Sequence, residues 1–305
     1  MACRPRRGVV AFLLAVIVTG CSTSLGSSPE SPAEGPTTLP AIVPPTATST
    51  TARPETTTEP TSSSSTPDPR DVDAQVVVPD GPGPFPAVVL VHGGGWVTGN
   101  PSIMSPLADH LDSNGFLTVN TRYALAGFER PGFPAAVEDV ACAVRFAASH
   151  PDSDGTVAVI GHSAGAHIGA LVALTGDDYG EVCPYTGSGL PERFVGLAGP
   201  YDVIRLGPAI GAFFGEGPDR LPEEWEAGNP QLHTDANREL SSLILYGEND
   251  GLVTDGFAFD FHQALLDSGS DASLELVEGA RHNDMHDPHL IGDLVVTWLS
   301  RAQEP

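Results

Sequence analysis

The most informative stretch of the chain reads Thr156-Val157-Ala158-Val159-Ile160-Gly161-His162-Ser163-Ala164-Gly165. After Thr156, four apolar residues in a row are typical of a strand buried on both faces of a sheet. The small residues over 164–175 predict a helix that packs closely on that sheet. Between the two, Gly161, Ser163 and Gly165 match the Gly-x-Ser-x-Gly pattern of a sharp strand-to-helix turn.

This turn makes Ser163 the candidate nucleophile. A serine at its apex adopts strained backbone angles, so the residues two positions away must be small, as Gly161 and Gly165 are. The turn raises the serine hydroxyl above the sheet. It also places the free N–H groups of the helix N-terminus close to any negative charge that forms there.

A second motif, His92-Gly93-Gly94-Gly95-Trp96, directly follows an apolar run over 87–91. Glycines allow the backbone to turn its N–H groups toward a carbonyl oxygen that becomes negative during a reaction. We therefore expect an oxyanion hole formed by the amides of Gly94, Gly95 and Ala164. We expect His92 to brace this loop, and Trp96 to line an acyl pocket or to pack. A phosphate-binding loop is excluded because the chain has no lysine and neither glycine-rich phosphate pattern.

Asp250 and His282 are the candidate acid and base. Each follows a short segment that predicts a strand, over 243–246 and 274–277, and ligands and catalytic groups gather at the C-terminal edge of parallel sheets. His282 would take the proton of Ser163, while Asp250 would orient the imidazole. The order serine, aspartate, histidine is the order of the α/β-hydrolase arrangement.

Several residues offer alternative assignments. Glu248 could replace Asp250 as the acid. His167, one turn after Ser163, is expected to pack, and Asp202 is expected to have a structural or pocket role. A metal site is a weaker alternative because its ligands would be crowded into one loop; the candidates would be His282, Asp284, His286, Asp287 and His289.

The rest of the chain from residue 72 to 302 alternates apolar runs with amphipathic segments. Strands are expected over 87–91, 116–120, 156–160, 194–198, 243–246 and 274–277, and helices over 102–114, 134–150, 164–175, 256–266 and 292–300. This alternation predicts an α/β fold, a mostly parallel sheet with helices on both faces. Its roughly 230 residues suit a single domain.

Composition narrows the function classes. The net charge is −25, and every one of the 14 basic residues is an arginine. Such an acidic surface repels phosphate backbones and anionic lipids, which argues against nucleic-acid binding and polybasic membrane docking. A hydrophobic content of 40% supports a core but is too low for a polytopic membrane protein.

The first 71 residues have the pattern of a targeting signal followed by a spacer. Basic residues, a short apolar run and small residues before Cys21 predict an export signal over 1–20. Val18-Thr19-Gly20-Cys21 resembles a bacterial lipobox, which implies lipidation of Cys21 and anchoring on the extracytoplasmic face of the cell membrane; an ordinary signal peptide is the alternative. Residues 21–71, dominated by Ser, Thr and Pro, predict a disordered tether, whether glycosylated or a neutral spacer.

Two cysteines remain after such processing, Cys142 and Cys183. In an exported protein they suggest one disulfide. The alternative is a pair of separate buried thiols.

Taken together, these motifs resemble the α/β-hydrolase superfamily, and within it the esterase/lipase branch with a His-Gly-Gly-Gly loop, near BD-FAE and hormone-sensitive-lipase-like proteins. The resemblance covers residues 72–302. It implies a serine carboxylesterase that acts on small-molecule esters through an acyl-enzyme, with no metal or other cofactor. Ser163, His282 and Asp250 would be nucleophile, base and acid, and Gly94, Gly95 and Ala164 the oxyanion donors.

The sequence departs from that pattern in two places. A disordered tether is expected where hormone-sensitive-lipase-like proteins carry a helical cap. The insertion over 202–238 is expected to form a small lid, partly from Phe213, Phe214 and Trp225, which favours short- to medium-chain esters. Amide or formamide hydrolysis is a second hypothesis, since the His-Gly-Gly-x-Trp motif also resembles kynurenine formamidase-like proteins. A non-catalytic binding protein on the same scaffold is a third.

Overall fold

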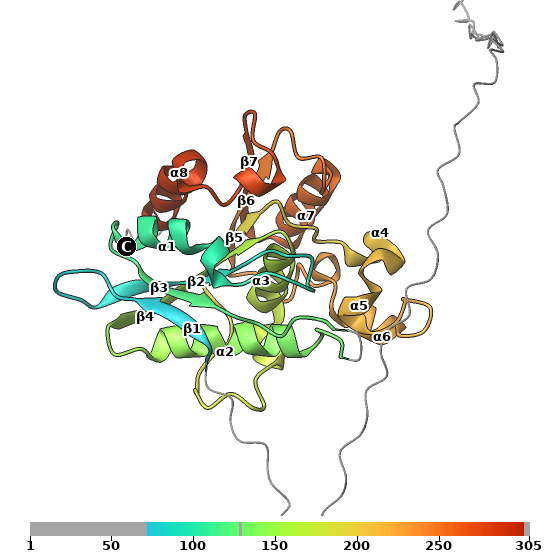
Figure 1. Cartoon of the computed structure of the whole chain (residues 1–305), viewed down its shortest axis with the longest axis horizontal. Helices are drawn as coiled ribbons and strands as arrows, with labels where there is room; N and C mark the ends of the chain where they lie inside the picture. The colour runs from blue at the N-terminus through green and yellow to red at the C-terminus, as the bar shows by residue number, and fades with distance from the viewer. Residues whose placement is uncertain (1–71, 128–129, 302–305) are drawn as a thin grey trace, which may run out of the picture. The chain divides into compact units, whose positions relative to one another are not determined.

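The computed structural model describes residues 72–127 and 130–301. The predicted signal peptide, Cys21 and the tether lie outside these described residues. The domain is built on a seven-stranded sheet in the order β1-β3-β2-β4-β5-β6-β7 (Figure 1). Its strands are β1 (Ala74–Val77), β2 (Phe85–Val91), β3 (Leu117–Thr121), β4 (Ser153–His162), β5 (Arg193–Leu197), β6 (Ser241–Gly247) and β7 (Asp271–Val277).

The sheet is parallel except for its first strand, which pairs antiparallel with β3. The predicted α/β architecture is therefore confirmed. The edge strand β1 is the element that sequence patterning missed. Three of its four residues are exposed, so it lacks the continuous buried run that marks the inner strands.

Helices cover both faces of the sheet. The longer ones are α1 (Ser105–Asp112), α2 (Ala135–Ser149), α3 (Ala164–Thr175), α7 (Asp255–Ser268) and α8 (Pro288–Arg301). Residues of α1 and α8 share one buried cluster, and residues of α2, α3 and α7 share the other. Along β4, Val157 and Val159 face the second cluster while Ile160 faces the first, which is the period-two pattern of a strand buried on both faces.

The helix expected over 102–114 is divided in the structure. A 3-10 turn, Pro101–Ile103, precedes α1, and Asn100 caps this turn by accepting a hydrogen bond from the Ser102 amide at 2.9 Å. A second proline, Pro106, lies in the first turn of α1, where its missing N–H costs nothing. The boundary thus follows from prolines and a cap that the apolar spacing alone did not show.

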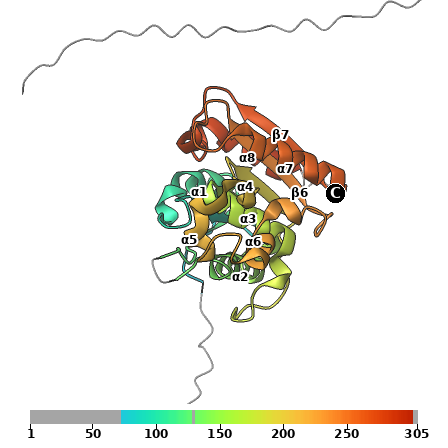
Figure 2. The ribbon, with the colours of Figure 1, turned by 90° about the vertical axis from the view of Figure 1, so that its right-hand side faces the viewer.

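The insertion between β5 and β6 forms three short helices, α4 (Val203–Leu206), α5 (Gly211–Phe214) and α6 (Pro222–Ala227). They lie together beside α3 in both views (Figure 2). Phe213, Phe214 and Trp225 are almost completely buried and belong to the main core cluster. The three rings pack against one another and join the main core, and the expectation that the insertion forms a small lid stays a prediction.

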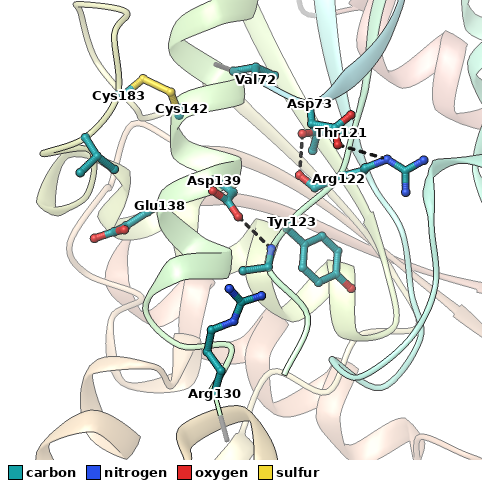
Figure 3. A pocket seen from close by; sticks show the side chains of 12 residues that line it. Val72, Asp73, Thr121, Arg122, Tyr123, Arg130, Glu138, Asp139, Cys142 and Cys183 are labelled. Atoms are coloured by element: carbon teal, nitrogen blue, oxygen red, sulfur yellow. Dashed lines mark hydrogen bonds and ion pairs between the residues drawn. A yellow bond between two sulfur atoms is a disulfide. The ribbon is translucent and has the colours of Figure 1, made fainter. Parts of the chain in front are cut away.

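A disulfide joins Cys142 on α2 to Cys183, which confirms the predicted pairing. It closes one side of a cavity of about 300 Å³ between α2 and the segment after β3 (Figure 3). On the other side, Asp139 of α2 accepts a hydrogen bond from the Ala124 amide at 2.8 Å. These contacts hold the segment that includes Tyr123, which in turn supports the glycine loop described below.

Candidate active site

Ser163 lies at the turn between β4 and α3 with φ 53° and ψ −119°. Its amide donates to the Leu197 carbonyl of β5 at 2.9 Å, which holds the turn against the sheet. A side chain at position 161 would strike the Gly165 backbone, and one at position 165 would strike the carbonyls of Val91 and His92. The two glycines of the motif are therefore required because three backbone segments meet here.

The three predicted triad side chains lie in one hydrogen-bonded row. Ser163 Oγ is 2.8 Å from His282 Nε2, and His282 Nδ1 is 2.8 Å from Asp250 Oδ2. His282 begins a 3-10 turn (His282–Asp284) after β7, and Asp250 follows β6. Asp250 and His282 are both buried, whereas Ser163 is half-buried. Elements separated by more than one hundred residues thus meet at the C-terminal edge of the sheet.

The hydrogen bonds assign the proton positions. The second carboxylate oxygen of Asp250 accepts the amides of Leu252 at 2.8 Å and Val253 at 3.0 Å. An ionised carboxylate only accepts, so the Nδ1–H of His282 donates to Asp250. Nε2 is then unprotonated and accepts the hydroxyl proton of Ser163. This is the tautomer that a general base needs.

The glycine loop presents its amides as donors. Gly94 and Gly95 have φ values of +131° and +59°, which glycine adopts readily. The carbonyl of Gly94 accepts the amides of Val97 and Thr98, and a side chain at position 94 would strike the Thr98 carbonyl. Within the described part of the chain, the amides of Gly94, Gly95 and Ala164 donate to no other group. They are the free donors that an oxyanion hole requires.

The side chains around this loop pack as braces. His92 stacks on Tyr123 with ring centroids 4.5 Å apart, and the Tyr123 hydroxyl donates to the His92 carbonyl at 2.9 Å. Burial raises the pKa of Tyr123 well above its usual range, so the hydroxyl remains a donor. Trp96 is buried and donates from its indole to His167 Nδ1 at 3.1 Å.

The other residues considered from the sequence have structural roles. Glu248 accepts the Gly279 amide at 3.1 Å and is exposed, whereas Asp250 holds His282. Asp202 caps α4 and accepts from Asn229 at 3.1 Å. His167 packs, with its Nε2 donating to the Gly228 carbonyl at 2.8 Å. Across residues 72–127 and 130–301, no group of three histidine, cysteine or acidic residues is arranged to hold a metal.

One functional candidate escaped the sequence analysis: His162, the variable position of the Gly-x-Ser-x-Gly motif. It is buried, and its Nε2 donates to the backbone carbonyl of His282 at 3.0 Å. The motif itself carries no signal for this role. The contact joins residues 120 positions apart, so only the folded chain shows it.

A family model named BD-FAE matches residues 76–265, which is more than half of the chain. The chain belongs to the BD-FAE family. The matched region contains the turn over 161–165, the nucleophile elbow, together with the glycine loop and Asp250. His282 follows the matched region. The membership agrees with the site geometry, which is that of a serine hydrolase.

Two relatives extend the comparison. Esterase LipC of Mycobacterium tuberculosis is 32% identical over 126 residues, which cover 39% of this chain and 31% of LipC. The Arabidopsis thaliana protein named "Probable isoprenylcysteine alpha-carbonyl methylesterase ICMEL1" is 25% identical over 250 residues, covering 73% of this chain and 52% of its own length. This chain therefore spans about half or less of the relatives it matches.

Solved structures support the fold. A truncated carbohydrate esterase from gut microbiota matches with a TM-score of 0.64 and 17% identity, over 75% of this chain and 90% of that one. An esterase of Thermogutta terrifontis, solved with propionate bound, matches with a TM-score of 0.63 and 20% identity, over 76% and 88%. At such identities the likeness shows the α/β-hydrolase fold alone.

Proposed function

We propose that this protein is a serine carboxylesterase that hydrolyses short- to medium-chain carboxylic esters through an acyl-enzyme. The observation that carries the proposal is the hydrogen-bonded triad Ser163–His282–Asp250. Beside it lie three backbone N–H groups that donate to no acceptor among the described residues. Membership in the BD-FAE family and a relative named an esterase support ester chemistry.

The geometry supplies a complete reaction cycle. As Ser163 Oγ attacks the ester carbonyl, its proton passes to His282 Nε2, and Asp250 stabilises the resulting imidazolium. The carbonyl oxygen becomes negative and accepts hydrogen bonds from the free amides of the glycine loop and Ala164. His282 then gives its proton to the departing alcohol, which leaves an acyl-serine. His282 takes a proton from water as it attacks this ester, and then returns that proton to the departing Ser163 Oγ, which releases the carboxylic acid and restores the free hydroxyl.

The proposed preference for shorter acyl chains rests on the aromatic cluster beside the nucleophile. Trp96 directly follows the glycine loop, and His167 lies one turn after Ser163 on the same face of α3. Phe213 of the insertion contacts both rings, with centroid distances of 5.8 Å to Trp96 and 5.5 Å to His167. We infer that these buried rings limit the room for a long acyl chain, because two of them come from residues close to Ser163 and Gly95 in the sequence.

The test is a substrate panel measured with the protein and with Ser163→Ala. We expect hydrolysis of p-nitrophenyl esters to peak at acyl groups shorter than twelve carbons, and the variant to lose at least about 10³-fold in kcat. Full activity in Ser163→Ala would overturn the mechanism, and a peak at twelve carbons or longer would overturn the chain-length preference. Faster hydrolysis of N-formyl anilides than of phenyl acetate would favour an amidase instead.

We also propose that the enzyme is exported and held on the extracytoplasmic face of the cell membrane by lipid on Cys21. The lipobox-like Val18-Thr19-Gly20-Cys21 after a short apolar run supports this, since two or more acyl chains give stable anchoring. Among the described residues no helix is long and apolar enough to cross a membrane. Fractionation of cells should find the wild type with membranes and Cys21→Ala elsewhere; an unchanged membrane fraction would reject the lipid anchor.

A further inference from the structure

His162 ends β4 immediately before the nucleophile, and its imidazole lies between two loops of the site. On one side its Nε2 is 3.0 Å from the backbone carbonyl of His282. On the other side a side chain added at Gly93 would come within 2.8 Å of its Nδ1, so the ring lies directly against the glycine loop. The His162 side chain therefore contacts both the loop that begins with His282 and the glycine loop at Gly93. Its own backbone continues directly into the turn at Ser163.

The contacts define the state of this ring. A carbonyl only accepts, so Nε2 carries the proton and donates it to His282. Nδ1 is unprotonated and has no hydrogen-bond partner among the described residues. Burial lowers the pKa of His162 to about 3, so the ring is neutral wherever the protein is folded at ordinary pH. The neutral ring also lies beside the imidazole of His282, with centroids 5.1 Å apart.

The contact matters because, among the described residues, it is a hydrogen bond that ties the backbone of the loop over 278–284 to the end of β4. The residues just before His282 are held to the acid loop: the Asn249 amide donates to the Ala280 carbonyl at 2.9 Å, and the Gly279 amide donates to Glu248. The carbonyl of His282 also receives the Met285 amide of its own turn, at the long distance of 3.4 Å. The bond from His162 is the shorter one, and it comes from the last residue of β4, directly before Ser163.

We propose that His162 is a positioning residue that sets the distance between the catalytic base His282 and the nucleophile Ser163 through the His282 backbone, while supporting the oxyanion loop at Gly93. The donated hydrogen bond carries this role, and the ring takes no proton from the substrate. The proposal rests on the proposed esterase function, because it concerns the geometry of that same triad.

The experiment compares four variants with wild type, using p-nitrophenyl acetate. His162→Leu keeps similar bulk but has no donor, and His162→Asn has an amide too short to reach the carbonyl. His162→Gln places an amide nitrogen near the position of Nε2. The matched control is His262→Leu on α7, where the same kind of bond from Nε2 to the Ala272 carbonyl, 3.2 Å long, lies away from the triad. A fluorophosphonate probe counts reactive serines, so that kcat refers to folded enzyme.

We expect His162→Leu and His162→Asn to lose about 10- to 100-fold in kcat, with KM within about threefold of wild type, because a misplaced base affects the reaction more than binding. The rate of serine labelling by the probe should fall with kcat. His162→Gln should recover to within about threefold of wild type, and His262→Leu should keep its kcat even where thermal stability falls.

Two results would overturn the role of His162: kcat per labelled serine in His162→Leu within about twofold of wild type, or equal losses in His162→Gln and His162→Leu. These are distinguishable from failure of the proposed function, in which the wild type itself would not hydrolyse the ester. If His162→Leu does not fold, the comparison of His162→Asn with His162→Gln decides the question.

Discussion

The active site is assembled from two halves that are held together by different forces. On the β2 and β4 side, the glycine loop and the elbow are shaped by backbone contacts: Gly94, Gly161 and Gly165 each lie where a side chain would strike neighbouring backbone. On the β6 and β7 side, Asp250 and His282 are placed by side-chain hydrogen bonds of about the same length.

Because of this difference, we expect substitutions on the β2 and β4 side to act mainly on stability and those on the β6 and β7 side to act mainly on catalysis. The first half is packed so tightly that changing it disturbs the core, since close-packed backbone cannot yield without cost. In the second half the carboxylate and the imidazole are oriented by a few directional hydrogen bonds, so replacing one of these groups alters the proton positions.

The largest effect is expected on the β6 and β7 side of the site, from Asp250→Asn. The Asn oxygen would keep the amides of Leu252 and Val253, which places the NH₂ group against Nδ1 of His282. That ring must then carry its proton on Nε2, where it cannot accept from Ser163. We expect kcat to fall about 10⁴-fold, with a thermal midpoint close to that of wild type.

Glu248→Gln is the matched control because Glu248 lies two residues away and its side chain accepts the Gly279 amide in the loop after β7. Its kcat should remain near that of wild type. A loss in Glu248→Gln as large as that in Asp250→Asn would mean that the acid has been assigned to the wrong residue.

On the β2 and β4 side, Gly165→Ala should mainly lower the stability of the protein. The added carbon would strike the carbonyls of Val91 and His92, so β2 and the glycine loop would have to move away from α3. We expect the free energy of unfolding to fall by about 3 kcal/mol. Urea denaturation measures this change directly.

Gly217→Ala serves as the control, because no atom lies within 4 Å of the added carbon. Its free energy of unfolding should change by less than about 0.5 kcal/mol. Equal stability of Gly165→Ala and wild type would show that the elbow is more adaptable than its packing indicates.

The smallest effect concerns pH. Burial lowers the pKa of His167 to about 4, below the value near 6.5 of an unfolded histidine. Between these values the unfolded chain binds a proton that the folded chain does not, so stability is lost as the pH falls from about 6.5 toward 4. His162 acts in the same direction.

In His167→Gln the unfolded chain no longer binds a proton at this position. The glutamine amide can still donate to the Gly228 carbonyl. The dependence of its unfolding free energy on pH should be shallower than that of wild type by up to about 1.4 kcal/mol per pH unit. Urea denaturation across this range is the measurement. Identical slopes would mean that His167 is protonated in the folded state.

Local pattern was enough to predict much of this molecule. The inner strands, α2 and α3 were predicted within a few residues, because continuous apolar runs and helical stripes arise from neighbouring residues. The strand β1 was missed because its side chains are exposed, and α1 was predicted too long because an upstream cap and two prolines divide that segment. The packing of the Phe213, Phe214 and Trp225 rings against one another and the core was not predicted, since composition alone does not show which surface a ring contacts.

The sequence by itself determined the residue types that the chemistry needs: a serine between two glycines, a glycine loop after a buried strand, and an aspartate and a histidine after later strands. Such requirements are local, because steric limits on the backbone act within a few residues. Only the tertiary structure decided that Asp250 rather than Glu248 holds His282, and that His162 donates to a carbonyl far along the chain. Those choices depend on distances and angles between loops, which exist only once the parallel sheet has brought its strand ends to one edge.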